Sequence, residues 1–200
     1  MVKQKLLREF FTLCDGGVCQ DFLTEHEKAQ VASGQKVFLT GVMQRCDEPN
    51  GNGRIYPRSV LEREMQNYSK LIKERRATGE LDHPENTEVR LQNVSHLVVE
   101  SWWDGDAVMG KIEILNTPAG KILQELIKAN VTLGISSRGM GSTRQVEGVT
   151  MVEDDFALLC YDMVSEPSTT GAFMMKESLA HVVLTKADRI NRKLNEILDS

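Results

Sequence analysis

The chain has few cysteines for its length, and none of them is spaced for metal binding. The four thiols, Cys14, Cys19, Cys46 and Cys160, include no CxxC pair in 200 residues. A chain of this length buries a core without covalent staples, so a disulfide framework is not expected either. We expect four reduced thiols, no structural zinc site and a reducing compartment, the cytoplasm.

Basic charge is also scarce. There are 24 Lys and Arg residues against 29 Asp and Glu residues, which leaves a formal net charge of −5. Proteins that bind nucleic acid through its phosphates usually carry a basic surface. The composition therefore argues against a general nucleic-acid-binding protein.

Long apolar runs are missing as well. The most apolar part of the N-terminus, residues 1–14 (MVKQKLLREFFTLC), is interrupted by Arg8 and Glu9. A signal-peptide core or a membrane span would need an unbroken apolar stretch. We therefore expect no membrane partner.

What is present is a pattern of short apolar strands separated by turns, with two internal helices. Strands joined by short turns favour a mainly antiparallel sheet, closed or nearly closed into a β-barrel with helices around it. The fold class expected is thus α+β. The expected strands span residues 37–43, 94–99, 107–115 and 150–164, the last of them a long strand or one half of a hairpin. The expected helices span residues 58–77, ending before Gly79, and a stretch after the N-cap Thr117.

The chain divides into a main domain and two flanking parts. Residues 1–36 have no clear pattern, although Leu6, Leu7, Phe10 and Phe11 have helical spacing. Residues 37–180 form the expected domain. Residues 181–200 have apolar side chains every three or four positions, which predicts a helical tail, either packed on the domain or docking as in a coiled coil.

Two adjacent serines are candidate nucleophiles. Ser136 and Ser137 lie in residues 134–139 (GISSRG), where flanking glycines predict a sharp turn. In extended backbone successive side chains alternate, so one of the two would face a site. Backbone N–H groups of Ser137 to Gly139, helped by Arg138, could hold an oxyanion. The alternative is a polar turn without chemistry.

A histidine could act as the base for such a serine. His83 lies in residues 79–84 (GELDHP), and Pro84 keeps its backbone out of the helical region. A base is often oriented by a carboxylate. Asp162 is the one charged residue in the apolar run 156–164. A charge buried in such a strand would need a partner. His96, on an expected strand, is the alternative to Asp162 as the third member of a triad. The alternative for His83 itself is a solvated loop histidine without a catalytic role.

Five stretches, taken in order, resemble the prohead core proteases of T4-like tailed phages. The likeness covers roughly residues 37–172 and depends on the order and spacing of the stretches. They are residues 52–57 (NGRIYP), 79–84 (GELDHP), 102–105 (WWDG), 134–142 (GISSRGMGS) and 162–168 (DMVSEPS).

The resemblance implies a serine endopeptidase related in fold to the herpesvirus assembly proteases, a β-barrel with surrounding helices. It implies that His83 and Ser136 are the catalytic pair, with Ser137 as the alternative nucleophile. Asp162 is the expected third member of a Ser-His-Asp triad, and His96 the alternative because the herpesvirus enzymes use a second histidine. No metal or organic cofactor is implied.

The resemblance also implies a place of action and substrates. Such enzymes work inside the phage prohead in the host cytoplasm, degrade the scaffold core, trim capsid proteins and cut themselves, with a homo-oligomer expected. Cleavage follows Glu in Leu/Ile-x-Glu, so Glu9 and Glu196 are the self-cleavage candidates, whereas Glu125 lies in an expected helix. The competing interpretations are an inactive relative of capsid or tail-tube proteins and an esterase, although no Gly-x-Ser-x-Gly elbow is present.

Overall fold

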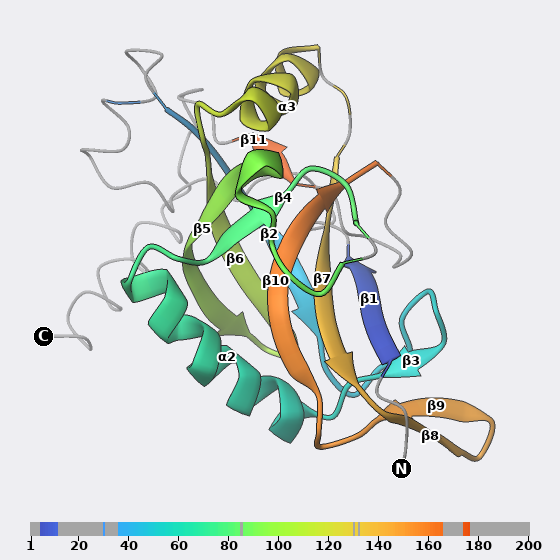
Figure 1. Ribbon diagram of the computed structural model, residues 1–200. Coiled ribbons are helices and arrows are strands. Elements are labelled where there is room, and N and C mark those ends of the chain that lie inside the picture. The colour runs from blue at the N-terminus through green and yellow to red at the C-terminus, as the bar shows by residue number, and fades with distance from the viewer. Residues whose placement is uncertain are drawn as a thin grey trace, which may run out of the picture.

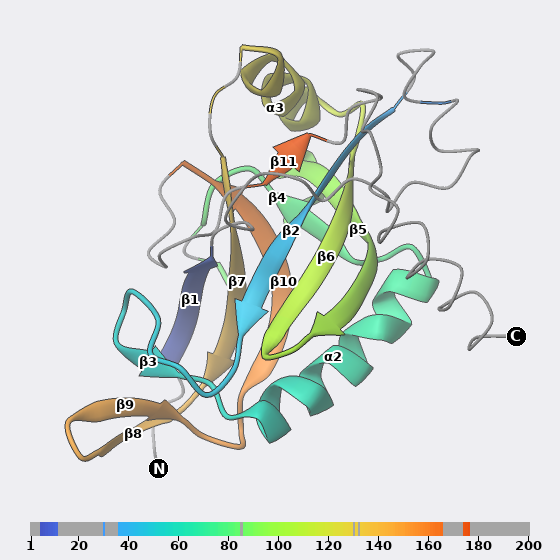
Figure 2. The ribbon, with the colours of Figure 1, turned by 180° about the vertical axis from the view of Figure 1, so that it is seen from behind.

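Strands, nearly all of them paired antiparallel, are the main secondary structure of the part of the chain that the computed structural model describes (Figures 1 and 2). Helices α2 (Arg58–Lys73) and α3 (Pro118–Lys128) pack beside the strands. Neither helix is apolar over enough residues to cross a membrane, as far as the described residues go. The described residues are 5–11, 30, 36–84, 86–129, 131, 133–165 and 174–176.

The largest sheet has five strands in the order β11-β2-β6-β5-β4, all antiparallel. Its centre is the pair formed by β5 and β6, which a tight turn at Gly105 joins, as the Asp-Gly-Asp sequence predicts. The strands are β2 (Val37–Arg45), β4 (Thr78–Glu80), β5 (Val94–Asp104), β6 (Ala107–Ile114) and β11 (Met175–Lys176).

A second sheet, in the order β1-β7-β10, carries the serine segment on its middle strand. Strands β1 (Lys5–Phe11) and β10 (Ala157–Val164) both pair antiparallel with β7 (Gly134–Gly141). A small third sheet contains β3 (Arg54–Ile55), β8 (Thr143–Val146) and β9 (Val149–Val152).

One hydrophobic core joins the two larger sheets and both helices. Residues from each layer contribute, such as Met43 of β2, Tyr68 of α2, Leu123 of α3 and Tyr161 of β10. The rings of Tyr68 and Tyr161 meet edge to face, with centroids 5.5 Å apart. This packing fixes β10, and with it the second sheet, against α2 (Figure 1).

The fold agrees in part with the expectation of an antiparallel barrel. The content is mostly β with two helices, and Thr117 caps α3 by accepting a hydrogen bond from the N–H of Gly120 at 3.0 Å. A closed barrel is not found among the described residues. The five-stranded and second sheets approach each other at an isolated bridge between Leu81 and Met163.

Several local predictions are wrong. Helix α2 ends at Lys73, because Arg75 takes the left-handed position (φ 55°) that Gly79 was expected to supply. The helical spacing near Leu6 belongs to strand β1, which pairs with β7. The expected long strand 150–164 is two strands, β9 and β10, in different sheets. The tail 181–200 lies outside the described residues.

Candidate functional site

Strands β7 and β10 bring four polar side chains to one face of their sheet. Ser136 and Arg138 are two residues apart on β7 and therefore project to the same side. Asp162 is the register partner of Ser136, and Cys160 is the partner of Arg138. Side chains directly opposite on paired strands are in contact range, so the pairing builds the cluster from two short sequence segments.

The loop after β4 adds His83 to this cluster. Leu81 bridges Met163, and the N–H of Asp82 donates to the carbonyl of Met163 at 2.8 Å. Asp82 takes a left-handed conformation (φ 66°), which Asp tolerates better than most residues and which turns the chain toward β10. His83 thus reaches Asp162 from 79 residues away in sequence.

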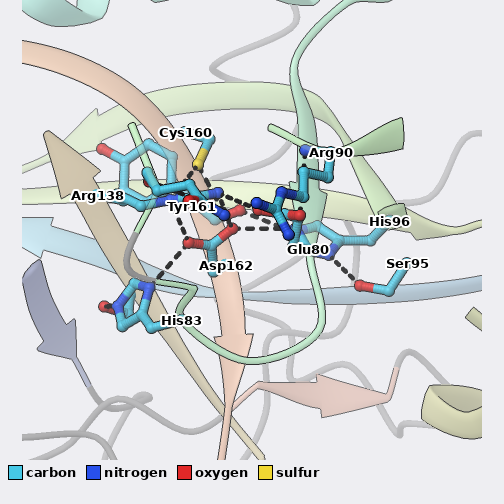
Figure 3. Close-up of polar contacts among 11 residues, drawn as sticks. Glu80, His83, Arg90, Ser95, His96, Arg138, Cys160, Tyr161 and Asp162 are labelled. Atoms are coloured by element: carbon cyan, nitrogen blue, oxygen red, sulfur yellow. Dashed lines mark hydrogen bonds and ion pairs between the residues drawn. The ribbon is translucent and has the colours of Figure 1, made fainter. Parts of the chain in front are cut away.

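The imidazole of His83 joins Asp162 to Ser136. Figure 3 shows the contact between His83 and Asp162. Its Nδ1 lies 2.8 Å from Oδ2 of Asp162, and its Nε2 contacts Oγ of Ser136. A carboxylate only accepts hydrogen bonds, so Nδ1 carries the proton and Nε2 is left to accept from the serine hydroxyl. This arrangement can remove a proton from a hydroxyl and stabilise the resulting imidazolium.

Asp162 is held ionised by several donors. The N–H of Glu80 donates to Oδ1 at 3.0 Å, and Nη2 of Arg138 donates to the same oxygen at 3.2 Å. Nε of Arg138 forms an ion pair with Oδ2 at 2.9 Å. Burial on its own would raise the pKa of Asp162, but the hydrogen bond with His83, the charge of Arg138 and the Glu80 amide bring it below its usual value.

The two alternatives from the sequence lie elsewhere. The hydroxyl of Ser137 is buried on the other side of β7 and has no hydrogen-bond partner among the described residues. The ring of His96 is bound to the hydroxyl of Ser95 at 2.9 Å and to the carbonyl of Tyr161 at 3.0 Å. The geometry therefore favours Ser136 over Ser137 and Asp162 over His96.

A profile of the family described as prohead core protein serine protease matches residues 14–182. The chain belongs to that family. It is 27% identical over 172 residues to the prohead core protein protease of Enterobacteria phage T4, which covers 83% of this chain and 81% of the relative. The solved structure of the bacteriophage T4 capsid assembly protease superposes with a TM-score of 0.69 at 25% identity, covering 81% of this chain and 98% of that one.

The expected oxyanion donors of this prohead core protease are not where the sequence suggested. Residues 134–141 form a strand rather than a turn, and Ser137, Arg138 and Gly139 pair with β1 on one side and β10 on the other. Their N–H groups are consequently engaged in the sheet. The guanidinium of Arg138 is fully buried and paired with Asp162, so this geometry does not favour the expected role at an oxyanion.

One buried polar residue next to Asp162 and Arg138 was not identified from the sequence. Glu80 is fully buried, and its Oε2 accepts from Nη2 of Arg138 at 2.6 Å. Asp162 was singled out because a buried charge needs a partner. The same reasoning would have applied to Arg138 if residues 134–139 had been recognised as a strand. Glu80 would then have been a candidate partner. No cluster of three or more His, Cys, Asp or Glu side chains suited to a metal occurs in the described part of the chain.

Proposed function

We propose that this prohead core protease is a serine endopeptidase with Ser136 as nucleophile, His83 as general base and Asp162 as the residue that orients His83. The observation that carries the proposal is the unbroken chain of contacts from Oδ2 of Asp162 through the imidazole to Oγ of Ser136. Three residue types in this order and contact form the geometry by which Ser-His-Asp triads are recognised on unrelated folds.

The mechanism follows from these contacts. Nε2 of His83 takes the hydroxyl proton as Oγ of Ser136 attacks the peptide carbonyl, and Asp162 stabilises the imidazolium that results. The imidazolium then gives its proton to the leaving amine, and the peptide bond breaks to form an acyl-enzyme. Water, deprotonated by the same imidazole, attacks the ester; the bond to Oγ of Ser136 breaks, Oγ takes the proton back from the imidazolium, and the acid is released.

The relatives support a role in capsid maturation. The two T4 proteins are called a prohead core protein protease and a capsid assembly protease. By similarity we assign this chain to the prohead interior in the host cytoplasm, where it degrades the scaffold core and trims major capsid proteins. Cleavage after Glu in Leu/Ile-x-Glu, and assembly into a homo-oligomer, remain parts of this proposal.

Self-processing after Glu9 is a further part of the proposal, and the pairing of β1 supports it. The antiparallel register sets Glu9 opposite Ser137 and Phe10 opposite Ser136. The bond between Glu9 and Phe10 thus runs, extended, beside the proposed nucleophile, which is fully buried. Glu125, in contrast, lies in helix α3, where its peptide bonds are not extended. Glu196 lies outside the described residues.

The deciding experiment is cleavage of a Leu-x-Glu peptide by wild type and by Ser136→Ala, Ser137→Ala and His83→Ala, followed by mass spectrometry. We expect cleavage after Glu by wild type and Ser137→Ala. The other two variants should lose roughly 10⁴- to 10⁶-fold in rate.

Other outcomes have distinct meanings. Loss of activity only in Ser137→Ala would move the nucleophile by one residue. Wild type that cleaves no peptide, either alone or in co-expressed proheads, would refute the proposal in favour of an inactive structural relative. Hydrolysis of a small ester but of no peptide would indicate an esterase.

A further inference from the structure

A buried ion pair lies directly behind the proposed triad (Figure 3). Glu80 and Arg138 meet at 2.6 Å, and both side chains are fully inaccessible, as is Asp162. Burying three charges is costly, and such an arrangement is weak evidence for a role in stability alone. Two carboxylates and one guanidinium give −1 −1 +1, a formal charge of −1 inside the protein.

The guanidinium of Arg138 holds Asp162 in one orientation. Its Nη2 donates to Oδ1 of that carboxylate at 3.2 Å and to Glu80, while its Nε, which donates to Sγ of Cys160, forms an ion pair with Oδ2 at 2.9 Å. A planar guanidinium can make these contacts together, whereas the point charge of a lysine cannot. Arg138 therefore sets the direction in which Asp162 presents Oδ2 to His83.

The same ion pair holds the loop that carries His83. Nη1 of Arg138 donates to the carbonyl of Asn86 at 2.9 Å, beyond His83 in the chain. Oε1 of Glu80 accepts from the N–H of Arg90 at 3.1 Å, where the loop leaves the cluster. Because Glu80 itself begins the loop, the buried pair closes it at both ends.

We propose that Glu80 and Arg138 are positioning residues of the protease, which orient Asp162 and the His83 loop and keep the buried cluster negative. The proposal rests on the proposed function. When His83 accepts the serine proton, the negative cluster becomes neutral overall, and this favours the imidazolium. Glu80 makes the cluster negative, because the charges of Arg138 and Asp162 alone would sum to zero.

Other titratable or charged groups near the cluster do not change its formal charge of −1 at neutral pH. The thiol of Cys160, 3.4 Å from Oδ1 of Asp162, is neutral, because burial and the nearby carboxylate raise its pKa well above the usual value. His96, behind the carbonyl of Tyr161, is also neutral, since burial lowers its pKa to about 4. The side chains of Asp82 and Arg90 are exposed, so solvent screens their charges.

The test compares the pH dependence of kcat/KM on a Leu-x-Glu peptide for the full chain, Glu80→Gln, Arg138→Gln and the double variant. Their formal cluster charges are −1, 0, −2 and −1. Glu80→Gln should move the acid limb to lower pH, and Arg138→Gln to higher pH, each by roughly half a unit or more. The double variant should return the limb to the wild-type position, with kcat lowered about tenfold or more and KM little changed.

Two further variants separate positioning from folding. Arg138→Lys keeps the charge but loses the planar guanidinium, so kcat should fall while the acid limb stays in place, and this variant still tests the proposal if Arg138→Gln does not fold. Glu113→Gln removes a carboxylate that Arg75 and Lys36 bind in the other sheet and should leave the profile unchanged.

Shifts in the same direction in both single variants, or none in either, would overturn the proposal while leaving the protease activity established. Wild type without peptidase activity would instead refute the proposed function, and this inference with it.

Discussion

At the scale of single residues, burial separates two histidines that sequence alone treats alike. The side chain of His83 is 7% exposed and bound to a carboxylate. His96 is completely buried. Its Nε2 donates to the carbonyl of Tyr161, and its Nδ1 accepts from the hydroxyl of Ser95. His96 therefore supports the backbone next to Asp162, and burial lowers its pKa to about 4.

The neutral state of His96 makes stability depend on pH. The folded-state pKa of about 4 lies below the ordinary value of 6.5, so the unfolded chain binds the proton more readily. The stabilisation is complete above about pH 6.5 and is lost as the pH falls from there toward 4. Its upper limit is about 3 kcal/mol.

This prediction is measured by urea unfolding at several pH values with Ser136→Ala as the background, which prevents self-cleavage. Between pH 7 and 4 we expect the free energy of unfolding to fall by up to about 3 kcal/mol more than in His96→Gln, which keeps a donor for Tyr161 but does not titrate. Parallel curves for the two proteins would contradict the prediction.

At the scale of elements, strands β4, β5 and β10 approach each other more closely than side chains normally allow. A Cβ on Gly79 would lie 1.9 Å from the carbonyl oxygen of Tyr161 and 2.4 Å from the ring of His96. This contact lets β4 pair with β5 while its end lies against β10, and the register shift after Gly79 then directs Glu80 into the site.

We therefore expect Gly79→Ala to be strongly destabilising. Backbone must move to admit the methyl group, so the free energy of unfolding should fall by roughly 2–3 kcal/mol, with loss of activity. The matched control is Gly148→Asn in the turn between β8 and β9, where φ is +85° and nothing lies within 4 Å of the added atom. The control should lose less than about 1 kcal/mol. Equal losses by urea unfolding would show that the close approach is unimportant.

At the scale of the whole molecule, strand β1 returns to the sheet that carries the proposed nucleophile. Strand β1 pairs with β7 along the whole of its length, so the self-cleavage candidate Glu9 lies beside β7 of the same chain. We therefore expect removal of residues 1–9 to be intramolecular and first order, with a rate independent of protein concentration. Mass spectrometry of the N-terminus over a tenfold dilution series would measure this.

The controls for self-cleavage use the same chain. An isotope-labelled Ser136→Ala protein mixed with wild type should keep its N-terminus, whereas Glu9→Gln should block processing and Glu125→Gln should not. Rapid cleavage of the labelled protein in the mixture, with a rate proportional to concentration, would contradict the intramolecular prediction.

Several elements could be predicted from the sequence because their signals are local. A short apolar, β-favouring run predicts the strand at residues 37–43, an Asp-Gly pair predicts the turn at Gly105, and a Thr-Pro step predicts the capped start of α3. The structure has all three. The family likeness followed from short motifs in a fixed order, and the family is confirmed. Asp162 was recognisable because a lone charge in an apolar strand must find a partner.

The groups that surround Asp162 come from segments far apart in the sequence, so local patterns did not predict them. The glycines in residues 134–139 predicted a turn, but the segment is a strand, because pairing with strands on both sides outweighs the turn preference of glycine. Arg138 consequently turns toward Asp162 instead of an oxyanion, and Glu80 joins it from 58 residues away. Such contacts depend on strand register and burial. Both are set when segments distant in the sequence pack together, so the local sequence pattern does not predict them.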